Sequence, residues 1–117
     1  MRTSRKNKQL LLHILDYCDQ VNDAVDRIGT FENLISTSFN KNALSMPLMQ
    51  IGELTGNLTD DLKEAHSHIP WVQIRALRNV LVHSYGKIEW ERIWDTAIHD
   101  IPDLKAKCVE IEKEIER

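Results

Sequence analysis

Apolar residues recur every three or four positions along most of the chain, which is the period of an amphipathic α-helix. The clearest run begins at Leu11 and ends at Ile28, where Gly29 can stop the helix. One face of this helix would carry Leu11, Ile14, Cys18, Val21, Val25 and Ile28. No stretch alternates apolar and polar residues in the manner of a strand. The pattern therefore predicts a long first helix that buries one face.

Two threonines mark the beginnings of short helical turns. Thr30 can cap a turn over residues 31–36, after which we expect a polar loop around Asn40. Thr59 can cap a second short turn, and the polar residues 64–68 then favour a loop. Both turns are predicted to connect longer helices.

A second long amphipathic pattern covers residues 44–58 and contains a proline. Pro47 has no backbone N–H, so it is tolerated in the first turn of a helix and disruptive inside one. It therefore either kinks this helix or lies in its first turn, behind a cap at Ser45. The sequence leaves both possibilities open.

The C-terminal half continues the helical pattern. Pro70 suits the first position of a helix over about residues 71–84. The core face of that helix would carry Ile74, Leu77 and Leu81, with Val82 as a further candidate for the core. A final helical segment begins near Glu89 and is interrupted at Pro102. We predict an all-α fold, an antiparallel bundle of four to five helices that forms a single domain over residues 1–117.

Composition and charge narrow the possible partners. Hydrophobic residues make up 42% of the chain and charged residues 28%, which is typical of a folded globular protein. The net charge of −3 argues against a broad basic surface for nucleic acid. Residues 71–87, however, contain Arg75, Arg78 and Lys87 and no Asp or Glu. This stretch can attract phosphate groups, and Arg75 and Lys87 are its candidate binding residues.

The N-terminal segment does not resemble a targeting signal. It begins with basic residues, but His13, Asp16 and Asp19 interrupt the apolar run that a signal peptide requires. No apolar run approaches the roughly 20 residues that cross a bilayer. We therefore expect a cytoplasmic protein that does not enter the membrane.

Residue types that bind metals are scattered along the chain. Cys18 and Cys108 each lie on an apolar stripe without a nearby partner cysteine, which favours buried thiols over a disulfide or a metal site. His66 and His68 are close in sequence, but no third ligand is evident, so a solvated loop is the better interpretation. We predict no metal site and no cofactor.

The most informative segment is RNVLVHSY, residues 78–85, because it gathers four chemically useful side chains at the end of one helix. Each helical residue turns the chain by about 100°. Asn79 and His83 therefore stack one turn apart, while Arg78 and Tyr85 share the neighbouring stripe. Polar groups in this arrangement need solvent or partners. We expect them to line a cleft against a second helix or a second copy of the chain.

These side chains suit cleavage of an RNA phosphodiester without a metal ion. An imidazole exchanges protons near neutral pH, so His83 can serve the 2′-hydroxyl or the leaving oxygen. Arg78 can donate hydrogen bonds to the phosphate oxygens as negative charge accumulates. Asn79 could orient His83, and Tyr85 could stack on a base or donate its proton. On the residues alone, a capping histidine and a structural arginine remain an open alternative.

The same segment resembles the signature of the HEPN superfamily, in which an arginine is followed after four to six residues by His-x-Tyr. The layout of the whole chain is similar to the HepT-like toxin branch in its segments Gln50-Ile-Gly-Glu53, Ile69-Pro-Trp71, and Trp94 with Asp100-Ile-Pro-Asp-Leu104. One departure is Ser84, where relatives often have glycine.

This resemblance implies a homodimer in which Arg78, His83 and Tyr85 of two subunits line one cleft and cleave RNA. It also implies a partner, an MntA-type nucleotidyltransferase antitoxin that silences the toxin by transferring AMP to Tyr85. Glu53 either pairs with Arg78 to position it or remains a solvated side chain. The apolar faces of the first and last helices suit either the dimer interface or the core of one chain. A second hypothesis is a non-catalytic subunit that docks the nucleotidyltransferase.

Overall fold

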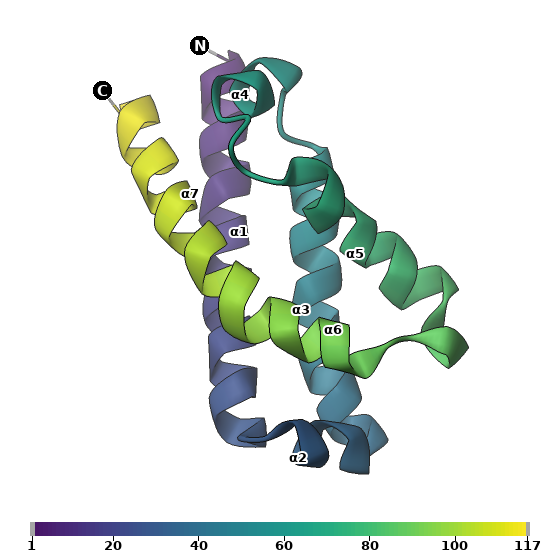
Figure 1. Ribbon diagram of the computed structural model, residues 1–117. Helices are drawn as coiled ribbons and strands as arrows, with labels where there is room; N and C mark the ends of the chain where they lie inside the picture. The colour runs from purple at the N-terminus through teal and green to yellow at the C-terminus, as the bar shows by residue number, and fades with distance from the viewer. Residues whose placement is uncertain (1, 117) are drawn as a thin grey trace.

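The computed structural model describes the backbone of residues 2–116 and the side chains of residues 5–84 and 86–115, and all its regular elements are helical (Figure 1). In chain order the α-helices are α1 (Arg2–Ile28), α2 (Phe31–Ser36), α3 (Ser38–Gly56), α4 (Asp60–Ala65), α5 (Trp71–His83), α6 (Trp90–Asp95) and α7 (Ile101–Glu116). A 3-10 turn over Tyr85–Lys87 follows α5, and a π-helical turn over Thr96–Asp100 links α6 to α7. The predicted all-α fold is confirmed.

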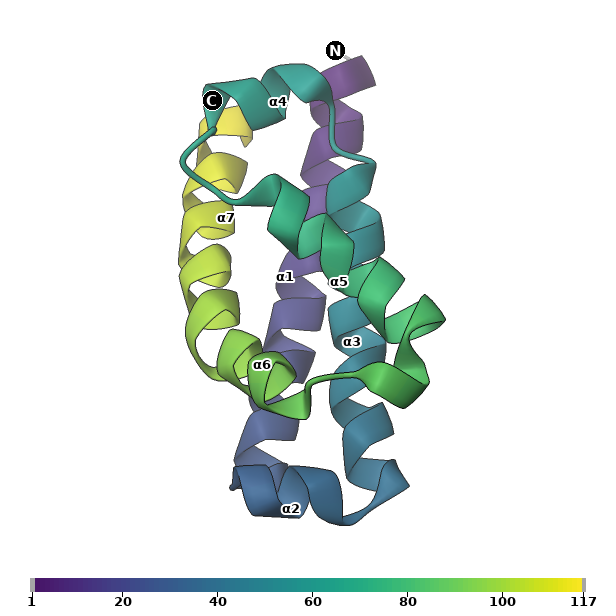
Figure 2. The same cartoon turned by 45° about the vertical axis from the view of Figure 1, so that its right-hand side comes forward.

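The helices are arranged around α1, which packs against both α3 and α7 (Figures 1 and 2). α5 packs against α3 and crosses it obliquely, so its C-terminal end and the following turn stand out to one side of the bundle. The short helices α2 and α4 lie at opposite ends of the bundle. Within the described part of the chain, none of the helices combines the length and the apolarity that a bilayer crossing requires.

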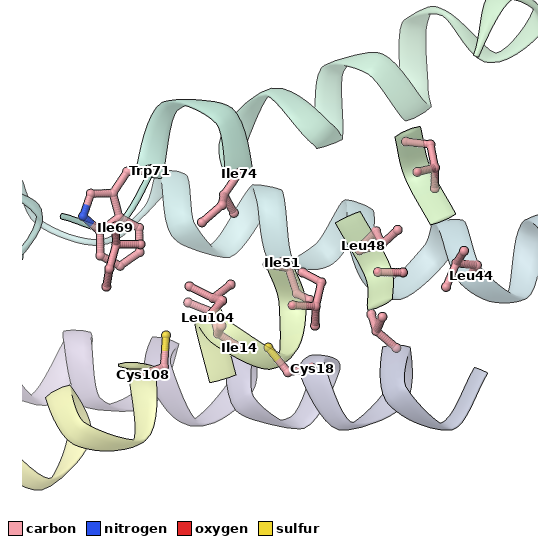
Figure 3. Close-up of a cluster of buried hydrophobic side chains, with 14 of the residues drawn as sticks. Ile14, Cys18, Leu44, Leu48, Ile51, Ile69, Trp71, Ile74, Leu104 and Cys108 are labelled. Atoms are coloured by element: carbon pink, nitrogen blue, oxygen red, sulfur yellow. The ribbon is translucent and has the colours of Figure 1, made fainter. Parts of the chain in front are cut away.

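The core consists mainly of apolar side chains from α1, α3, α5 and α7, and each short helix adds one buried residue, namely Leu34, Leu62 and Ile93. Figure 3 shows part of this cluster, in which the buried residues include Ile14, Cys18, Leu44, Leu48, Ile51, Ile74, Leu104 and Cys108. The predicted apolar faces of the first and last helices, for which the sequence left two uses open, therefore form the core of one chain. Burial of such faces is the main source of stability in a helical bundle.

The predicted caps are present. Gly29 has a φ of 85°, a left-handed conformation that favours glycine, and it ends α1. The side chain of Thr30 accepts a hydrogen bond from the Asn33 N–H at 3.1 Å. Thr59 accepts one from the Leu62 N–H at 3.4 Å and so begins α4. Because α4 continues to Ala65, the predicted loop after it is shorter than expected.

The predictions around Asn40 and Pro47 need correction. Asn40 lies inside α3 and not in a loop, because Thr37 caps this helix by accepting a hydrogen bond from the Asn40 N–H at 3.1 Å. α3 therefore starts well before Pro47, which is buried in the helix interior. The first-turn alternative for Pro47 is wrong, and Ser45 is a buried helical residue and not a cap.

The interruption predicted at Pro102 takes a different form. Pro102 is the second residue of α7, and the helical path continues through it. The preceding turn widens instead, because the Ile101 N–H donates to the carbonyl of Thr96, five residues back. Because proline has no backbone N–H, it is accommodated after such a turn. α6, the π-helical turn and α7 therefore follow one another without a break in the helical path.

Candidate active site

The motif lies on α5, whose N-terminal half is anchored in the bundle. The indole N–H of Trp71 donates to the carbonyl of His66 at 3.1 Å, and Trp71, Ile74 and Leu81 are the buried residues of this helix. Val82, which the sequence offered as a further core candidate, is 42% exposed and not part of the core. The C-terminal half of α5 thus presents most of its surface to solvent.

Arg78 is held on α5 by a residue of α3. Its Nε lies 3.2 Å from Oε2 of Glu53, and the two side chains are 40% and 53% exposed. The ion pair that the sequence left open is therefore present. Arg78 Nη1 also donates to Oδ1 of Asn79 at 3.4 Å. These two contacts direct the guanidinium along the surface between α3 and α5 and leave part of it accessible to an anion.

His83 occupies a different side of the same helix. The five-residue step from Arg78 turns α5 by about 140°, so His83 does not share the side of α5 that faces Glu53. His83 is exposed, and no described side chain forms a hydrogen bond or an ion pair with it. Asn79, which we expected to orient His83, contacts Arg78 instead. A single chain therefore brings Arg78, Glu53 and Asn79 together and leaves His83 open.

The position of Tyr85 differs from the predicted stripe. α5 ends at His83, and the backbone of Tyr85 belongs to the following 3-10 turn, Tyr85–Lys87. The α-helical step that would have aligned Tyr85 with Arg78 is therefore interrupted at Ser84. The side chain of Tyr85 lies outside the described residues.

A hollow of about 390 Å³ lies between α5 and α6, beside the end of the motif. Its polar lining includes Ser84, Lys87 and Arg92, and its apolar lining includes Leu77 and Val80. Sequence reasoning missed Arg92. The only available signal was its place one turn after Glu89, and Arg92 Nε does lie 3.4 Å from Oε2 of that residue.

The two cations proposed for phosphate binding lie in different places. Lys87 lines the hollow between α5 and α6, whereas the guanidinium of Arg75 lies over Gly56 of α3. Arg75 therefore lies against α3, the helix whose Glu53 pairs with Arg78, and Lys87 lies near the C-terminal end of α5. The sequence grouped Arg75 and Lys87 by charge, but their positions on α5 and the following turn separate them.

The remaining titratable candidates serve the fold. Cys18 and Cys108 are free and buried, as predicted. Burial raises the pKa of each thiol to about 12, and for Cys18 the neighbouring Cys108 and Asp19 add to the effect. His66 Nε2 lies 3.5 Å from Oε2 of Glu114, which links the loop after α4 to α7. Among the described residues, no group of three acidic, histidine or cysteine side chains is placed to hold a metal ion.

Comparison with known proteins identifies relatives that match along most of their length. "Putative RNase TTE0752" of Caldanaerobacter subterraneus subsp. tengcongensis is 34% identical over 101 residues, which cover 86% of this chain and 89% of that protein. "Putative RNase MJ1216" of Methanocaldococcus jannaschii is 30% identical over 112 residues, covering 96% and 92% respectively. "Probable ribonuclease HepT" of Thermococcus cleftensis is 30% identical over 104 residues, covering 84% and 94%.

No solved structure matches the chain significantly. The protein family described as "Ribonuclease HepT-like" matches residues 14–111, from α1 to α7, and so includes both helices that hold the Arg78–Glu53 pair. The chain therefore belongs to the HepT-like ribonuclease family.

Proposed function

We propose that this protein is a metal-independent endoribonuclease in which Arg78 and His83 act on the scissile phosphate. The proposal rests on how α5 presents the two side chains. Arg78 is anchored by Glu53 yet partly exposed, and His83 is exposed. Membership of a ribonuclease family supports the same activity.

The chemistry requires two proton transfers. The 2′-oxygen attacks phosphorus, the bond from phosphorus to the 5′-oxygen breaks, one group accepts the 2′-hydroxyl proton and another protonates the 5′-oxygen. The products are a 2′,3′-cyclic phosphate and a 5′-hydroxyl. Arg78 would stabilise the negative charge that grows on the non-bridging oxygens. Because each chain supplies one motif histidine, a second copy of His83 would supply the second transfer.

A homodimer that joins two motifs is therefore part of the proposal. The helices that hold the Arg78–Glu53 pair also expose apolar side chains, including Met46 on α3 at 55% and Val72 on α5 at 79%. Exposed apolar side chains near a polar site are typical of an interface. An isologous contact through α3 and α5 would bring the open His83 of each subunit toward the other motif.

The oligomeric state gives a direct test of this interface. Met46→Glu should convert a dimer into a monomer in sedimentation equilibrium, because a charge would be buried in the contact. Leu12→Glu is the matched control, since Leu12 is 47% exposed on α1, a helix outside the proposed contact through α3 and α5. A monomeric wild-type protein, or equal dissociation by both substitutions, would contradict the interface.

Activity is tested on total RNA in the presence of EDTA. Removing a general acid or base lowers the rate by about 10²- to 10⁴-fold, so His83→Ala should lower the cleavage rate at least about a hundredfold. Arg78→Ala should lower it by about the same factor, because the phosphate oxygens lose the guanidinium that stabilises their charge. His99→Ala is the control, because His99 is an exposed histidine of the π-helical turn. Equal cleavage by wild type and His83→Ala would refute the assignment. Absence of cleavage by the unmodified wild type, with intact binding of a nucleotidyltransferase, would favour the non-catalytic subunit instead.

We further propose that an MntA-type nucleotidyltransferase silences the protein by modifying Tyr85. The phenol oxygen would attack the α-phosphorus of ATP, release pyrophosphate and become AMP-linked. Its neighbours Ser84 and Gly86 are exposed, which fits access by an enzyme. An added phosphate beside the motif would repel RNA.

Intact-mass analysis after incubation with such an enzyme, ATP and Mg²⁺ should show added AMP units in the wild type and in Tyr17→Phe. Tyr17 is half-buried on α1 and serves as the control. Tyr85→Phe should show none, and persistence of the added mass in that variant would exclude Tyr85 as the acceptor.

A further inference from the structure

α3 and α5 lie close together at Gly52, on the helix that carries Glu53. A Cβ atom at position 52 would lie 3.0 Å from the Cβ and 3.0 Å from the backbone N of Arg78, and 3.1 Å from the carbonyl oxygen of Ile74. These separations are shorter than ordinary van der Waals contacts. Two of the three atoms belong to the backbone of α5, so a rotation of one side chain cannot relieve the contact.

The crossing point and the ion pair involve the same residue of α5. The backbone N and Cβ of Arg78 are the atoms that a side chain at Gly52 would meet, and the Nε of Arg78 lies 3.2 Å from Oε2 of Glu53. The distance between the axes of α3 and α5 at Gly52 therefore sets the position of the Arg78 backbone. That position decides whether the guanidinium can reach Glu53. A displacement of a few tenths of an ångström would act on the motif arginine before any other motif residue.

Gly56, one turn further along α3, provides a natural contrast. A Cβ atom placed there would coincide with the guanidinium of Arg75 and would meet no backbone atom of α5 among its nearest neighbours. That guanidinium is the far end of a flexible, exposed side chain. An added methyl group at position 56 can therefore be accommodated by moving Arg75 into solvent, without moving α5.

We propose that Gly52 is a positioning residue for the proposed reaction: its missing side chain lets α5 approach α3 closely enough for Glu53 to orient Arg78. The inference rests on the proposed ribonuclease function for its consequence in catalysis. Its structural part, the dependence of the Arg78–Glu53 contact on Gly52, stands independently of RNA cleavage.

The direct test compares Gly52→Ala with Gly56→Ala, which add the same methyl group to the same helix one turn apart. In NMR spectra of arginine Nε–H groups, Gly52→Ala should shift the Arg78 signal by more than the Arg75 signal. Gly56→Ala should do the reverse. Arg78→Lys and Arg75→Lys variants assign the two signals. This measurement requires no catalytic activity.

In steady-state cleavage of a short RNA, Gly52→Ala should lower kcat by about five- to tenfold and change KM by less than about twofold, because misplacing a catalytic group by a fraction of an ångström acts on the chemical step. Gly56→Ala should leave kcat unchanged. In a Glu53→Gln background, Gly52→Ala should lower kcat by less than about twofold further, because the contact it disrupts is already lost.

Each result decides a separate point. An unchanged Arg78 signal in Gly52→Ala, or additive losses of kcat in the double variant, would overturn the positioning role. Failure of Gly52→Ala to fold, while Gly56→Ala folds, would also overturn it in favour of packing alone. A wild-type protein that cleaves no RNA, with the NMR signals moving as expected, would refute the proposed function and retain the structural link from Gly52 to Arg78.

Discussion

The contact between α1 and α7 and the contact between α3 and α5 differ in what they bury. On the first, Ile14, Cys18 and Cys108 are completely excluded from solvent. The second also buries apolar side chains, Ile51 and Ile74 among them, but in addition it brings α5 close to Gly52 and places a half-exposed ion pair, Arg78–Glu53, beside that point. Closed apolar packing supplies stability, whereas a close crossing with polar groups at its edge fixes the direction of a side chain. The closed core thus holds the fold together, and its open edge at the C-terminal half of α5 presents the motif.

The largest expected effect concerns the two buried thiols, Cys18 and Cys108, on α1 and α7. Burial raises their pKa from 9.0 to about 12, which at pH 8 leaves about a thousandfold less thiolate than in the unfolded chain. Labelling by 5,5′-dithiobis(2-nitrobenzoate) should therefore be at least about a thousandfold slower for the folded protein than in urea. Rapid labelling of the folded protein would show that the contact between α1 and α7 opens readily.

The same shift predicts a dependence of stability on pH. Because the folded thiols stay protonated, their contribution is present below pH 9 and is lost as the pH rises from 9 toward 12, where the unfolded thiols ionise first. Cys108→Ala should reduce this loss relative to wild type when urea midpoints are compared at pH 8 and pH 10.5. An identical decline in both proteins would assign it to other groups.

The next largest effect is the loss of unfolding free energy when apolar side chains in the two regions are truncated. Ile14→Ala removes a fully buried side chain of α1 and should lower the free energy of unfolding by about 2–5 kcal/mol, since a cavity remains. Val82→Ala removes an exposed side chain of α5 and should change it by about 0.5 kcal/mol or less. Urea unfolding followed by circular dichroism measures both. Equal losses would contradict the division between a core region and a presenting region.

The sequence predicted well the features that depend on nearby residues. The apolar face of α1 follows from spacing alone, and the caps at Thr30 and Thr59 follow from the residue type before each turn. The end of α5 was placed within one residue because Gly86 and Ser84 follow His83 closely. Such signals act within one or two turns of the backbone.

Two features of α3 were predicted poorly. Asn40 was assigned to a loop for its polarity, yet its Nδ2 donates to the carbonyl of Asn33 at 2.8 Å and stays within α3. Pro47 is tolerated inside the same helix while buried in the core. For Pro47, packing between elements overrides the local preference of the residue. For Asn40 the overlooked signal was local, namely the cap at Thr37.

The contacts of the site residues were likewise not predictable from their neighbours in sequence. Glu53 and Arg78 are 25 residues apart, and only the crossing of α3 and α5 determines that they meet. Arg75 and Lys87 carry the same charge, but one lies on Gly56 and the other lines the hollow beside α6. Periodicity tells which residues share a face of one helix and does not tell which neighbour covers that face.

The Arg78–Glu53 pair should affect activity more than stability. Glu53→Gln should change the free energy of unfolding by less than about 1 kcal/mol, because both partners are partly exposed. It should lower RNA cleavage about fivefold to tenfold by releasing Arg78. Asp103→Asn is the matched control, since it breaks another partly exposed pair, with Lys107 Nζ at 2.8 Å, on α7. Comparable loss of cleavage in both variants would deny the pair a specific role.

The smallest expected effect concerns the salt dependence of RNA binding, and it tests which cation of the basic stretch contacts phosphate. Lys87 lines the hollow next to the motif, so Lys87→Ala should weaken binding and reduce the slope of log K against log salt by about 0.7, as expected for the loss of one phosphate contact to a single strand. Arg75 rests on α3, and Arg75→Ala should change the slope less. Lys113→Ala, an exposed lysine of α7, should leave it unchanged. If Arg75 contributed the larger change, RNA would follow the α3 side of the motif, and the hollow beside α6 would not be part of its path.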